Sequence, residues 1–412
     1  MPSRRTAVAA ELPTATGTST MYLDRLFKLM ADKQASDMFF TAGAPIQIKI
    51  NGVVMPINNQ VLDPETVRKI CYELMTKEQI AEFEARHEMN FAKRGYSDEH
   101  GALGNFRVNI FHQRNTVSMV IRFVKPEVPA FDTLGLPPIL KEVIMEKLGL
   151  ILVVGSTGSG KSTTMASMID YRNSIRSGHI LTVEDPIEFA FKHKKSIVNQ
   201  REVRVDTLSY QQALISAMRE APDVIMIGEI RDQDTLVNAL LFAQTGHLCM
   251  STLHANNSYN ALNRIINFFP RDQRDALLSD VSISLRAVIS QRLVRTKDGK
   301  RVPAEEVLLN TKHIQDLIKA GDLSQIKDAM EQSLAPGSQT FEQALYDHIT
   351  SGRISVEEAM VHSDSPTNLH WLLNNAPKPV AGAATTAKGP STIAPTAPAD
   401  ITSIKLNLDA LG

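Results

Sequence analysis

The sequence is short of cysteine, of long apolar runs and of excess charge, and each shortage excludes a class of protein. Only Cys71 and Cys249 occur in 412 residues. They lie far apart among apolar neighbours, so they predict core thiols of a cytosolic protein and not a disulfide framework or a zinc site. No apolar run approaches the roughly 18 residues that a transmembrane helix needs. The net charge of −1 provides no whole-chain basic field that would attract nucleic acid.

What is present has a globular composition, with 43% hydrophobic and 22% charged residues, and its length predicts two domains with unstructured ends. Residues 1–20 form a predicted disordered leader without the apolar stretch of an export signal, and the sequence leaves open whether translation starts at Met1 or at Met21. Residues 373–412 are rich in Ala, Pro and Thr and too poor in large apolar side chains to fold, so we expect disorder there as well. Near the end, Ile404–Leu408 alternates like a strand, either as a docking peptide or as a frayed terminus.

Hydrophobic periodicity divides the rest of the chain into two parts. The pattern of residues 21–125 predicts a mixed α/β domain, with a helix at 22–32, one or two helices within 64–86, and strands at 38–41, 46–50, 53–57, 106–111 and 117–123. Residues 126–135 are a predicted linker, and the Pro-stiffened segment Lys125–Ala130 is its hinge. From 136 to 372, strand-like runs at 150–154, 179–183, 224–227 and 247–252 alternate with helices. This alternation indicates a mainly parallel sheet with helices on both faces, followed by further helices in 310–365.

A glycine-rich segment follows the first of these later strands and matches the pattern G-x-x-x-x-G-K-[ST] between a strand and a helix. Its glycines permit the tight turn that points backbone N–H groups at a phosphate, and the helix N-terminus adds partial positive charge. We expect Lys161 to reach the β- and γ-phosphates of ATP, and the Ser162 hydroxyl to ligate Mg²⁺. The predicted nucleotide-binding residues are Gly155, Ser156, Thr157, Gly158, Ser159, Gly160, Lys161, Ser162 and Thr163.

Three polar side chains lie at the carboxyl ends of later strands, which is where parallel sheets bind ligands. Glu184 is predicted to orient water or to hold Mg²⁺ through water, although an acidic turn at a strand end is an equal alternative. Glu229 follows an apolar strand on which Gly228 replaces the usual Walker B aspartate. We expect Glu229 to polarise the attacking water and to act on Mg²⁺ through water. His254 is expected to contact the γ-phosphate, although a lone histidine there is more often an ordinary hydrogen-bonded residue.

Arginines complete the predicted site. An arginine that is offered across a subunit interface stabilises the charge that spreads over a transferring phosphoryl group. Arg107 and Arg122 lie on the strand pair that precedes the hinge. We therefore predict that they fold over the nucleotide, against the simpler interpretation of solvated surface arginines. Beside Glu229, both Arg231 and Asp232 are candidates to hold that carboxylate or to bridge to a neighbouring subunit.

Together these segments resemble the secretion ATPases of type II secretion systems and type IV pili. The resemblance covers about residues 21–365, and it is carried by the phosphate loop Gly155–Ser162, the acidic box Glu184–Glu188, Gly228–Asp232 and the histidine box His247–His254. It implies a PAS-like mixed α/β N-terminal domain, a RecA-like P-loop core with a helical C-terminal subdomain, and Mg²⁺-dependent ATP hydrolysis coupled to mechanical work. It also implies a homohexameric ring that presses on a platform protein at the cytoplasmic face of the inner membrane.

Within that family, the chain is similar to the PilT/PilU retraction branch. The similarity is carried by Ser36–Pro45, Phe106–Asn109, Val198–Glu202 and Ile289–Leu293. Extension-type ATPases carry a four-cysteine zinc module, which two cysteines cannot supply. The PilT pattern has two arginines in a helix near the C-terminus, and the corresponding His313–Ala320 has neither. This departure and the long tail favour the PilU-type accessory retraction ATPases, which implies a PilT-type ATPase as a partner.

Three functions remain open on the sequence. The first is a motor ATPase that drives or assists pilus retraction and twitching motility. The second is a slow or non-hydrolysing regulatory subunit that binds nucleotide and acts on a PilT-type motor, but the presence of Lys161, Ser162, Glu184, Glu229 and His254 favours an active enzyme. The third is a nucleic-acid motor, for which a basic stripe with interleaved aromatic residues is missing.

Overall fold

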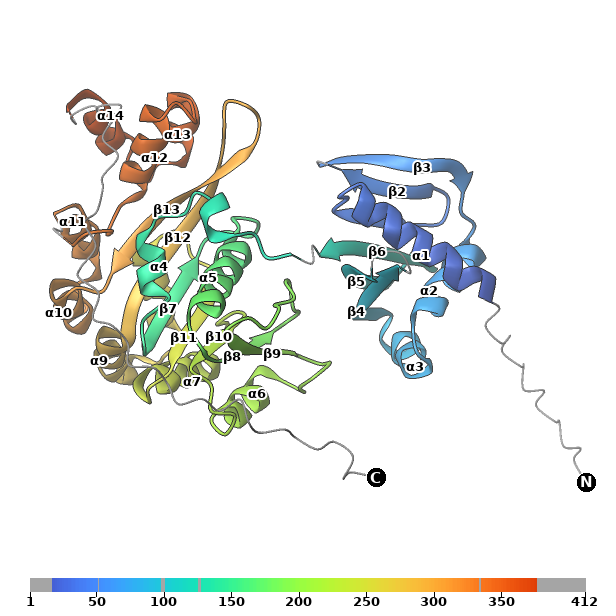
Figure 1. The fold of residues 1–412 in the computed structure, drawn as a ribbon, viewed down its shortest axis with the longest axis horizontal. Coiled ribbons are helices and arrows are strands. Elements are labelled where there is room, and N and C mark those ends of the chain that lie inside the picture. Colours follow the sequence, from blue (N-terminus) through green and yellow to red (C-terminus); the bar gives the residue numbers. More distant parts are fainter. Residues whose placement is uncertain (1–16, 51, 98–100, 125–126, 333–334, 376–412) are drawn as a thin grey trace, which may run out of the picture.

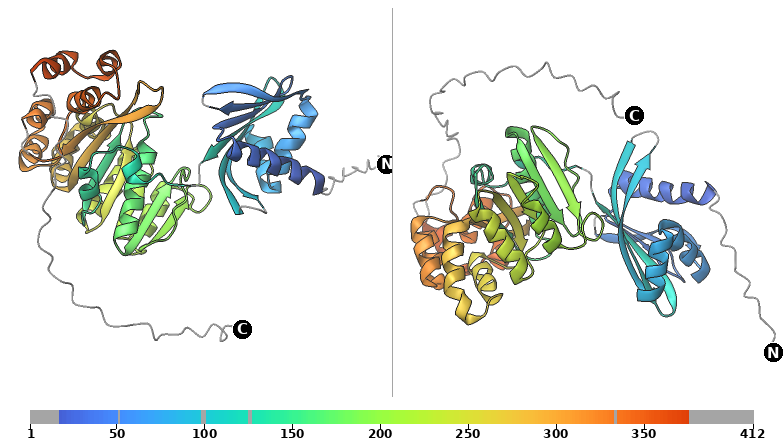
Figure 2. Two further views of the ribbon diagram at one scale, coloured as in Figure 1. Left: turned by 45° about the horizontal axis from the view of Figure 1, so that its top comes forward. Right: turned by 90° about the horizontal axis from the view of Figure 1, so that it is seen from below.

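The computed structural model describes residues 17–375 except 51, 98–100, 125–126 and 333–334, and the described residues form two β-sheets (Figure 1). Helices accompany each sheet, so the predicted α/β fold class is confirmed (Figures 1 and 2). Most of the predicted leader and tail, including Ile404–Leu408, lies outside the described residues. Helix α1 begins at Gly17 and α14 ends at Asn375, so the predicted limits of disorder at 20 and 373 are wrong by one helical turn at each end.

The N-terminal sheet is antiparallel, with the order β3-β2-β1-β6-β5-β4. Its strands are β1 (Asp37–Phe40), β2 (Pro45–Ile50), β3 (Val53–Val61), β4 (Glu88–Ser97), β5 (Gly101–Gln113) and β6 (Thr116–Val124). Helices α1 (Gly17–Asp32), α2 (Pro64–Leu74) and α3 (Lys77–Arg86) share one core with one face of this sheet. Strand alternation buries Phe106 and Val108 in that core and directs Arg107 and Asn109 to the opposite face.

Each helix and strand predicted for this domain is present, and one strand was missed. The pattern of β4 includes Lys93, Arg94 and Gly95 in succession, which hides the alternation that identifies strands. Strand β5 also runs further than predicted, to Gln113. The turn to β6 is therefore only Arg114 and Asn115, whose φ angles of 46° and 60° are left-handed, as in tight hairpin turns.

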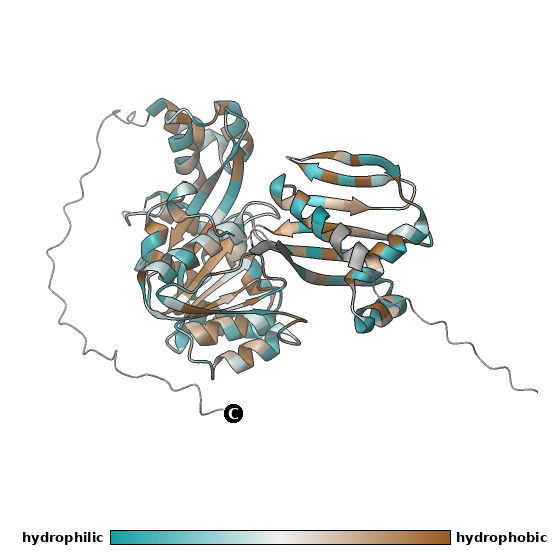
Figure 3. Ribbon diagram, turned by 45° about the vertical axis from the view of Figure 1, so that its right-hand side comes forward, coloured by the Kyte–Doolittle hydropathy of each residue, from teal (hydrophilic) through white to brown (hydrophobic). Residues whose placement is uncertain are grey.

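The second sheet has the order β13-β12-β7-β11-β10-β8-β9 and is parallel except for β13, which pairs antiparallel with β12. Its strands are β7 (Gly149–Val154), β8 (Gly178–Glu184), β9 (Ser196–Glu202), β10 (Val224–Ile227), β11 (Leu248–Leu253), β12 (Leu285–Arg295) and β13 (Arg301–Leu309). Leu150 and Leu152 belong to one core cluster, and Ile151 and Val153 belong to another on the opposite face. The central strands are accordingly mostly brown in Figure 3, as expected for strands that are covered on both sides.

Helices cover both faces of this sheet (Figure 2). The core on one face includes residues of the 3-10 turn η1 (Phe131–Thr133), α4 (Ile139–Val143) and α5 (Lys161–Ile175). The core on the other face includes residues of α6 (Tyr210–Ala217), α7 (Gln233–Gln244), α8 (Ser258–Asn267), α9 (Arg274–Ser284), α10 (Lys312–Ala320), η3 (Leu323–Gln325) and α11 (Ile326–Glu331), with η2 (Arg271–Gln273) between α8 and α9. Among the described residues, no helix is both long and apolar enough to cross a membrane.

A C-terminal bundle packs on the far ends of β12 and β13 (Figure 1). It consists of α12 (Phe341–Thr350), α13 (Val356–His362) and α14 (Pro366–Asn375). Leu345, Ile354 and Leu369 form its core together with Val294 of β12 and Ala304 of β13. The bundle is thereby tied to β12, whose Gln291 also contacts the glycine-rich loop.

Two features of the predicted organisation need correction. The strands β9, β12 and β13 were missed, because each carries polar side chains in its middle, such as Gln291 on β12. The predicted linker 126–135 is too long, because Phe131 is buried and its ring centroid lies 5.8 Å from that of Tyr171 on α5. Of the predicted hinge, Lys125 and Pro126 lie outside the described residues.

Candidate nucleotide-binding and catalytic site

The glycine-rich loop leaves the end of β7 and enters α5 at Lys161, as its motif predicts. Gly155, Gly158 and Gly160 have φ angles of 155°, 80° and 91°, a region that residues with side chains rarely adopt. At Gly155, an added Cβ would lie 2.5 Å from the carbonyl oxygen of Gln291 and 2.5 Å from Ser159 Oγ. At Gly160, an added Cβ would lie 2.7 Å from the side-chain amide nitrogen of Gln291. Glycine is therefore required at these two positions by steric contact as well as by backbone conformation.

Gln291 braces this loop from β12, a role that the sequence did not reveal. Its side-chain amide donates to the Ser159 carbonyl over 2.8 Å, and its carbonyl accepts from Thr164 Oγ1 over 2.6 Å. The side chain is 2% exposed, so both hydrogen bonds are shielded from water. The run Ile289–Leu293 was noted only as a family resemblance, because a glutamine within a strand carries no signal of its own.

The side chain of Lys161 folds back over the glycine-rich loop that precedes it. Its Nζ donates to the carbonyl oxygens of Gly155 and Ser156, over 2.9 and 2.8 Å. Burial lowers its pKa, and the carboxylates of Glu229 and Glu188 act in the opposite direction. The ammonium group is thus held beside the backbone cradle by bonds to neutral carbonyls, which a phosphate oxygen can replace with a stronger, charge-assisted bond.

Glu184 ends β8 and is almost completely buried. Its Oε1 accepts from Thr182 Oγ1 at 2.7 Å and from the Gln200 amide at 3.1 Å, and its Oε2 accepts from the backbone N–H of Glu188 at 3.4 Å. Desolvation nevertheless dominates and raises the pKa of Glu184 to about 7, against the effect of these hydrogen bonds. A carboxyl group with this pKa exchanges a proton readily at neutral pH.

Glu229 follows β10 and is held from two sides. Its Oε2 pairs with Arg231 Nε at 2.7 Å, and its Oε1 lies 3.1 Å from His254 Nε2. The preceding Gly228 leaves no room for a side chain, because a Cβ there would lie 2.7 Å from the Tyr210 hydroxyl and 3.3 Å from the Cα of Glu184. The absence of the usual aspartate at 228 is therefore a packing requirement.

One cavity of about 240 Å³ brings together predicted residues from four strand ends, whereas the predicted Ser159, Gly160 and Thr163 do not line it. Thr157, Gly158, Lys161 and Ser162 line it, as do Glu184, Glu188, Glu229, Arg231, Tyr210 and His254. Gly155 and Ser156 instead line a neighbouring cavity of about 540 Å³, which they share with His254 and the α8 residues Asn260, Asn263, Arg264 and Asn267. Tyr210 was not predicted, since a tyrosine at a helix start has no motif around it.

Two further sequence candidates have structural roles. Asp232 accepts from the backbone N–H of Thr235 at 2.8 Å and is the N-cap of α7, so the structure does not place it as a holder of Glu229. His247 lies before β11, at the opposite end of that strand from His254. Its ring contacts the ring of Phe242 edge-on, with centroids 5.7 Å apart.

The two predicted arginines of the N-terminal sheet make different contacts. Arg107 reaches the acidic box of its own chain, where its Nη2 lies 3.4 Å from the Pro186 carbonyl oxygen and 3.5 Å from Glu188 Oε1. Arg122, its cross-strand neighbour, pairs with Asp37 through Nε at 2.9 Å. Both line a cavity of about 860 Å³ between the sheet and residues 185–186 and 202–205. Arg107 thus touches two residues that line the nucleotide cavity, whereas the partner of Arg122, Asp37, lies outside that lining.

The parallel sheet, the glycine cradle with its lysine and the carboxylates at the strand ends define a P-loop nucleotide-binding protein. A family model described as "Type II/IV secretion system protein" matches residues 15–376, and the chain belongs to this family of secretion and pilus ATPases. It is 46% identical over 356 residues to the "Type IV pilus ATPase PilU" of Pseudomonas aeruginosa, an alignment that covers 86% of this chain and 91% of the relative.

Other relatives agree with this assignment. The chain is 38% identical to the "Type IV pilus retractation ATPase PilT" of Pseudomonas aeruginosa, over 84% of its own length and all of the relative's. A crystal structure titled "Pilus Retraction Motor PilT and Bound ADP" superposes with a TM-score of 0.78 at 41% identity, covering 85% of this chain and 99% of that one. The predicted resemblance to the PilT/PilU branch is therefore confirmed.

Proposed function

We propose that this protein is an ATP-hydrolysing motor of the type IV pilus machinery that drives or assists pilus retraction and twitching motility. The observation that carries the proposal is the position of Glu229, held between Arg231 and His254 in the same cavity as Lys161 and Ser162. A degenerate nucleotide-binding subunit has no need of a carboxylate that is oriented from two sides. The proposal draws its cellular setting from relatives named as pilus ATPases.

The proposed roles follow from charge and position. The backbone of residues 155–163 cradles the phosphates, and Lys161 reaches the β- and γ-phosphates. Glu229 polarises the attacking water, and His254, whose Nε2 lies 3.1 Å from Glu229 Oε1, contacts the γ-phosphate. Glu184 orients water or takes part in proton movement, since its pKa of about 7 suits either state at neutral pH.

The donor set fits Mg²⁺ bound together with ATP. The ion would neutralise phosphate charge when bound, held by the Ser162 hydroxyl and, through water, by Glu184 and Glu229. No group of three or more His, Cys, Asp or Glu side chains suited to a metal occurs among the described residues. Mg²⁺ that is bound with a nucleotide commonly takes most of its ligands from phosphate and water and not from a protein cage.

The wider assembly is proposed from the family. We propose a homohexameric ring at the cytoplasmic face of the inner membrane, with a platform protein of the pilus machine and a PilT-type ATPase as partners. Residues 17–124 and 131–375 act as separate domains, and hydrolysis moves one against the other about the segment 125–130. We propose that Arg107 responds to that movement, because its contacts with Pro186 and Glu188 join the two domains.

The second candidate is a slow regulatory subunit that acts on a PilT-type motor. It is favoured by the segment His313–Ala320, which forms most of α10 and lacks the two arginines of the PilT pattern. In this helix Ile314, Leu317 and Ile318 are buried, so the segment packs normally and differs in surface charge. A regulator of this kind would bind ATP but turn it over only beside its partner.

Twitching motility, measured in the organism that encodes the chain, distinguishes both candidate functions from the absence of any role in pilus retraction. We expect deletion of the gene to impair pilus retraction, restoration by the parental chain, and no restoration by Lys161→Ala. Glu84→Gln, a change on the N-terminal surface, is the matched control and should restore retraction fully. If Lys161→Ala restored retraction as well as the parent, nucleotide use by this chain would be irrelevant to the machine, and the proposal would fail.

A further inference from the structure

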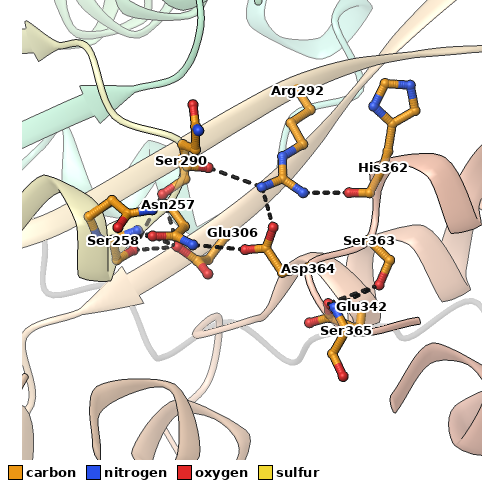
Figure 4. Close-up of polar contacts among 12 residues, drawn as sticks. Asn257, Ser258, Ser290, Arg292, Glu306, Glu342, His362, Ser363, Asp364 and Ser365 are labelled. Atoms are coloured by element: carbon orange, nitrogen blue, oxygen red, sulfur yellow. Dashed lines mark hydrogen bonds and ion pairs between the residues drawn. The ribbon is translucent and has the colours of Figure 1, made fainter. Parts of the chain in front are cut away.

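Three successive residues of β12 tie different parts of the site together. Gln291 faces α5 and braces the phosphate loop. Ser290 faces the other side and donates to Glu306 Oε1 at 2.9 Å, which also accepts from the N–H and the hydroxyl of Ser258 at the start of α8. Arg292 lies on the same side as Ser290, as strand alternation requires, and extends toward the C-terminal bundle (Figure 4).

Arg292 joins the bundle to the loop that follows His254. Figure 4 shows its guanidinium between the bundle residues His362 and Asp364. Nη1 donates to the His362 carbonyl at 2.5 Å, and Nη2 donates to Asp364 Oδ1 at 2.5 Å and to the Asn256 carbonyl at 3.2 Å. The guanidinium also lies 3.9 Å above the ring of Phe341, the first residue of α12.

Asp364 makes the same connection a second time. Its Oδ2 accepts from the side-chain amide of Asn257 at 2.9 Å, while its Oδ1 pairs with Arg292. Both polar atoms of the Asn257 side chain are hydrogen-bonded, because its Oδ1 also caps α8 by accepting from the N–H of Asn260 at 2.9 Å. The Arg292 and Asp364 side chains are 19% and 24% exposed, so the pair is largely shielded from solvent screening.

The bundle holds Asp364 in place from behind. Glu342 of α12 is 1% exposed, and its Oε1 accepts from Ser363 Oγ at 3.0 Å and from the backbone N–H of Ser365 at 2.7 Å. These two bonds fix the turn on either side of Asp364 (Figure 4). The aspartate is therefore presented by a rigid turn and not by a mobile chain end.

We propose that Arg292 and Asp364 are positioning residues that hold the loop His254–Asn257, so that the C-terminal bundle sets how well His254 is aligned with Glu229. The loop is fixed at one end by the contact of His254 with Glu229, and at the other by Asn256 and Asn257. The inference rests on the proposed function, because alignment of His254 matters only if the site hydrolyses ATP. Neither residue lines the nucleotide cavity, so both act through the loop.

The test compares steady-state Mg-ATP hydrolysis by the full chain with that of Asp364→Asn. We expect kcat to fall by about tenfold with KM for ATP changed by less than about twofold, because the phosphate loop keeps its brace through Gln291. Asn257→Ser should show the same split, since serine still caps α8 but lacks the side-chain amide that donates to Asp364, and its hydroxyl is one atom shorter. Combining the two changes should cost little more than either alone, because both break one connection.

Glu358→Gln is the matched control and should leave kcat unchanged. Glu358 is another bundle carboxylate that contacts β12, accepting from the N–H of Arg295 at 2.8 Å, but it does not touch the loop. Unchanged kcat in both Asp364→Asn and Asn257→Ser would overturn the proposal, as would an equal loss in Glu358→Gln. If Asp364→Asn does not fold, Asn257→Ser alone decides between these outcomes.

Hydrogen–deuterium exchange keeps this inference separate from the proposed function. In Asp364→Asn, amides of residues 254–260 should exchange faster than in the parent, while those of 155–164 should not change. Exchange can be measured whether or not the parent hydrolyses ATP. A parent without turnover would contradict the proposed function and leave the inference to this readout, and unchanged exchange over 254–260 would overturn the inference itself.

Discussion

Two glutamates at the ends of neighbouring strands have different chemical environments. Glu184 is 6% exposed and accepts hydrogen bonds from uncharged partners, and burial raises its pKa to about 7. Glu229 pairs with the guanidinium of Arg231 and contacts His254. Burial favours the protonated form of Glu184. Glu229 is oriented by Arg231 and His254, which suits its proposed role beside the attacking water.

The raised pKa of Glu184 predicts a pH-dependent cost to stability. The unfolded group titrates near 4.5 and the folded group near 7, so the folded protein binds more protons between these values. Stability from this group is full below 4.5 and is lost as pH rises to 7. We expect Glu184→Gln, which stays neutral, to lose less stability than the parent between pH 5 and 7.5 in urea unfolding. Parallel curves would show that Glu184 has an ordinary pKa.

The packing around Gly228 predicts a rescue. Gly228→Ala places a Cβ 2.7 Å from the Tyr210 hydroxyl, and we expect it to destabilise the protein by about 1–3 kcal/mol. Adding Tyr210→Phe removes the nearest atom and should restore part of that loss, as measured by urea unfolding. The Tyr210→Phe variant alone serves as the control. Full stability in Gly228→Ala would mean that the glycine is not required for packing.

At the scale of elements, motifs predicted the site better than they predicted its supports. The phosphate loop, Glu184, Glu229 and His254 each follow an apolar strand, and parallel strands carry their ends to one edge. Gln291 and Arg292 lie in the middle of β12, where polar residues suppress the strand signal and no spacing reveals their distant partners. The partner of Arg122 could not be predicted for a related reason, because Asp37 is 85 residues away.

The Gln291 brace predicts a specific loss of nucleotide affinity. Gln291→Ala removes both bonds that hold Ser159 and Thr164, so the phosphate loop loses its preorganised shape. We expect ADP to bind about tenfold more weakly by calorimetry. Gln315→Ala, which removes a glutamine that bonds only the Asn310 carbonyl, is the matched control and should bind ADP like the parent. Equal affinity in Gln291→Ala would assign loop shape to the glycines alone.

At the scale of the whole molecule, Arg107 of the N-terminal sheet contacts the acidic box that follows β8 in the second sheet. The guanidinium meets Pro186 and Glu188 of the same chain, and its Nε is buried without a hydrogen-bond partner. A buried donor without a partner costs free energy, typically about 1–3 kcal/mol. The orientation of Arg107 in this structure is therefore one that a further acceptor, such as a phosphate oxygen, would stabilise.

Mixed rings test whether Arg107 acts within its own chain. We expect Arg107→Ala and Lys161→Ala subunits, each inactive alone, to regain little ATPase activity when mixed, because Arg107 already reaches the acidic box beside its own phosphate loop. Size-exclusion chromatography must show that the two variants assemble together. Recovery to a substantial fraction of parental turnover would place the arginine in a neighbouring subunit's site, contrary to the contact seen in the single chain.

The most direct test of the central claim is the steady-state Mg-ATP hydrolysis rate of the purified chain beside Glu229→Gln. We expect turnover in the parent, loss by about a hundredfold or more in the variant and unchanged ATP binding in both, because glutamine keeps the shape but cannot polarise water. Chelation of Mg²⁺ should abolish parental turnover as well. Equal rates in parent and variant would contradict the role of Glu229, and a parent that binds ATP without hydrolysing it would identify the chain as a regulatory subunit.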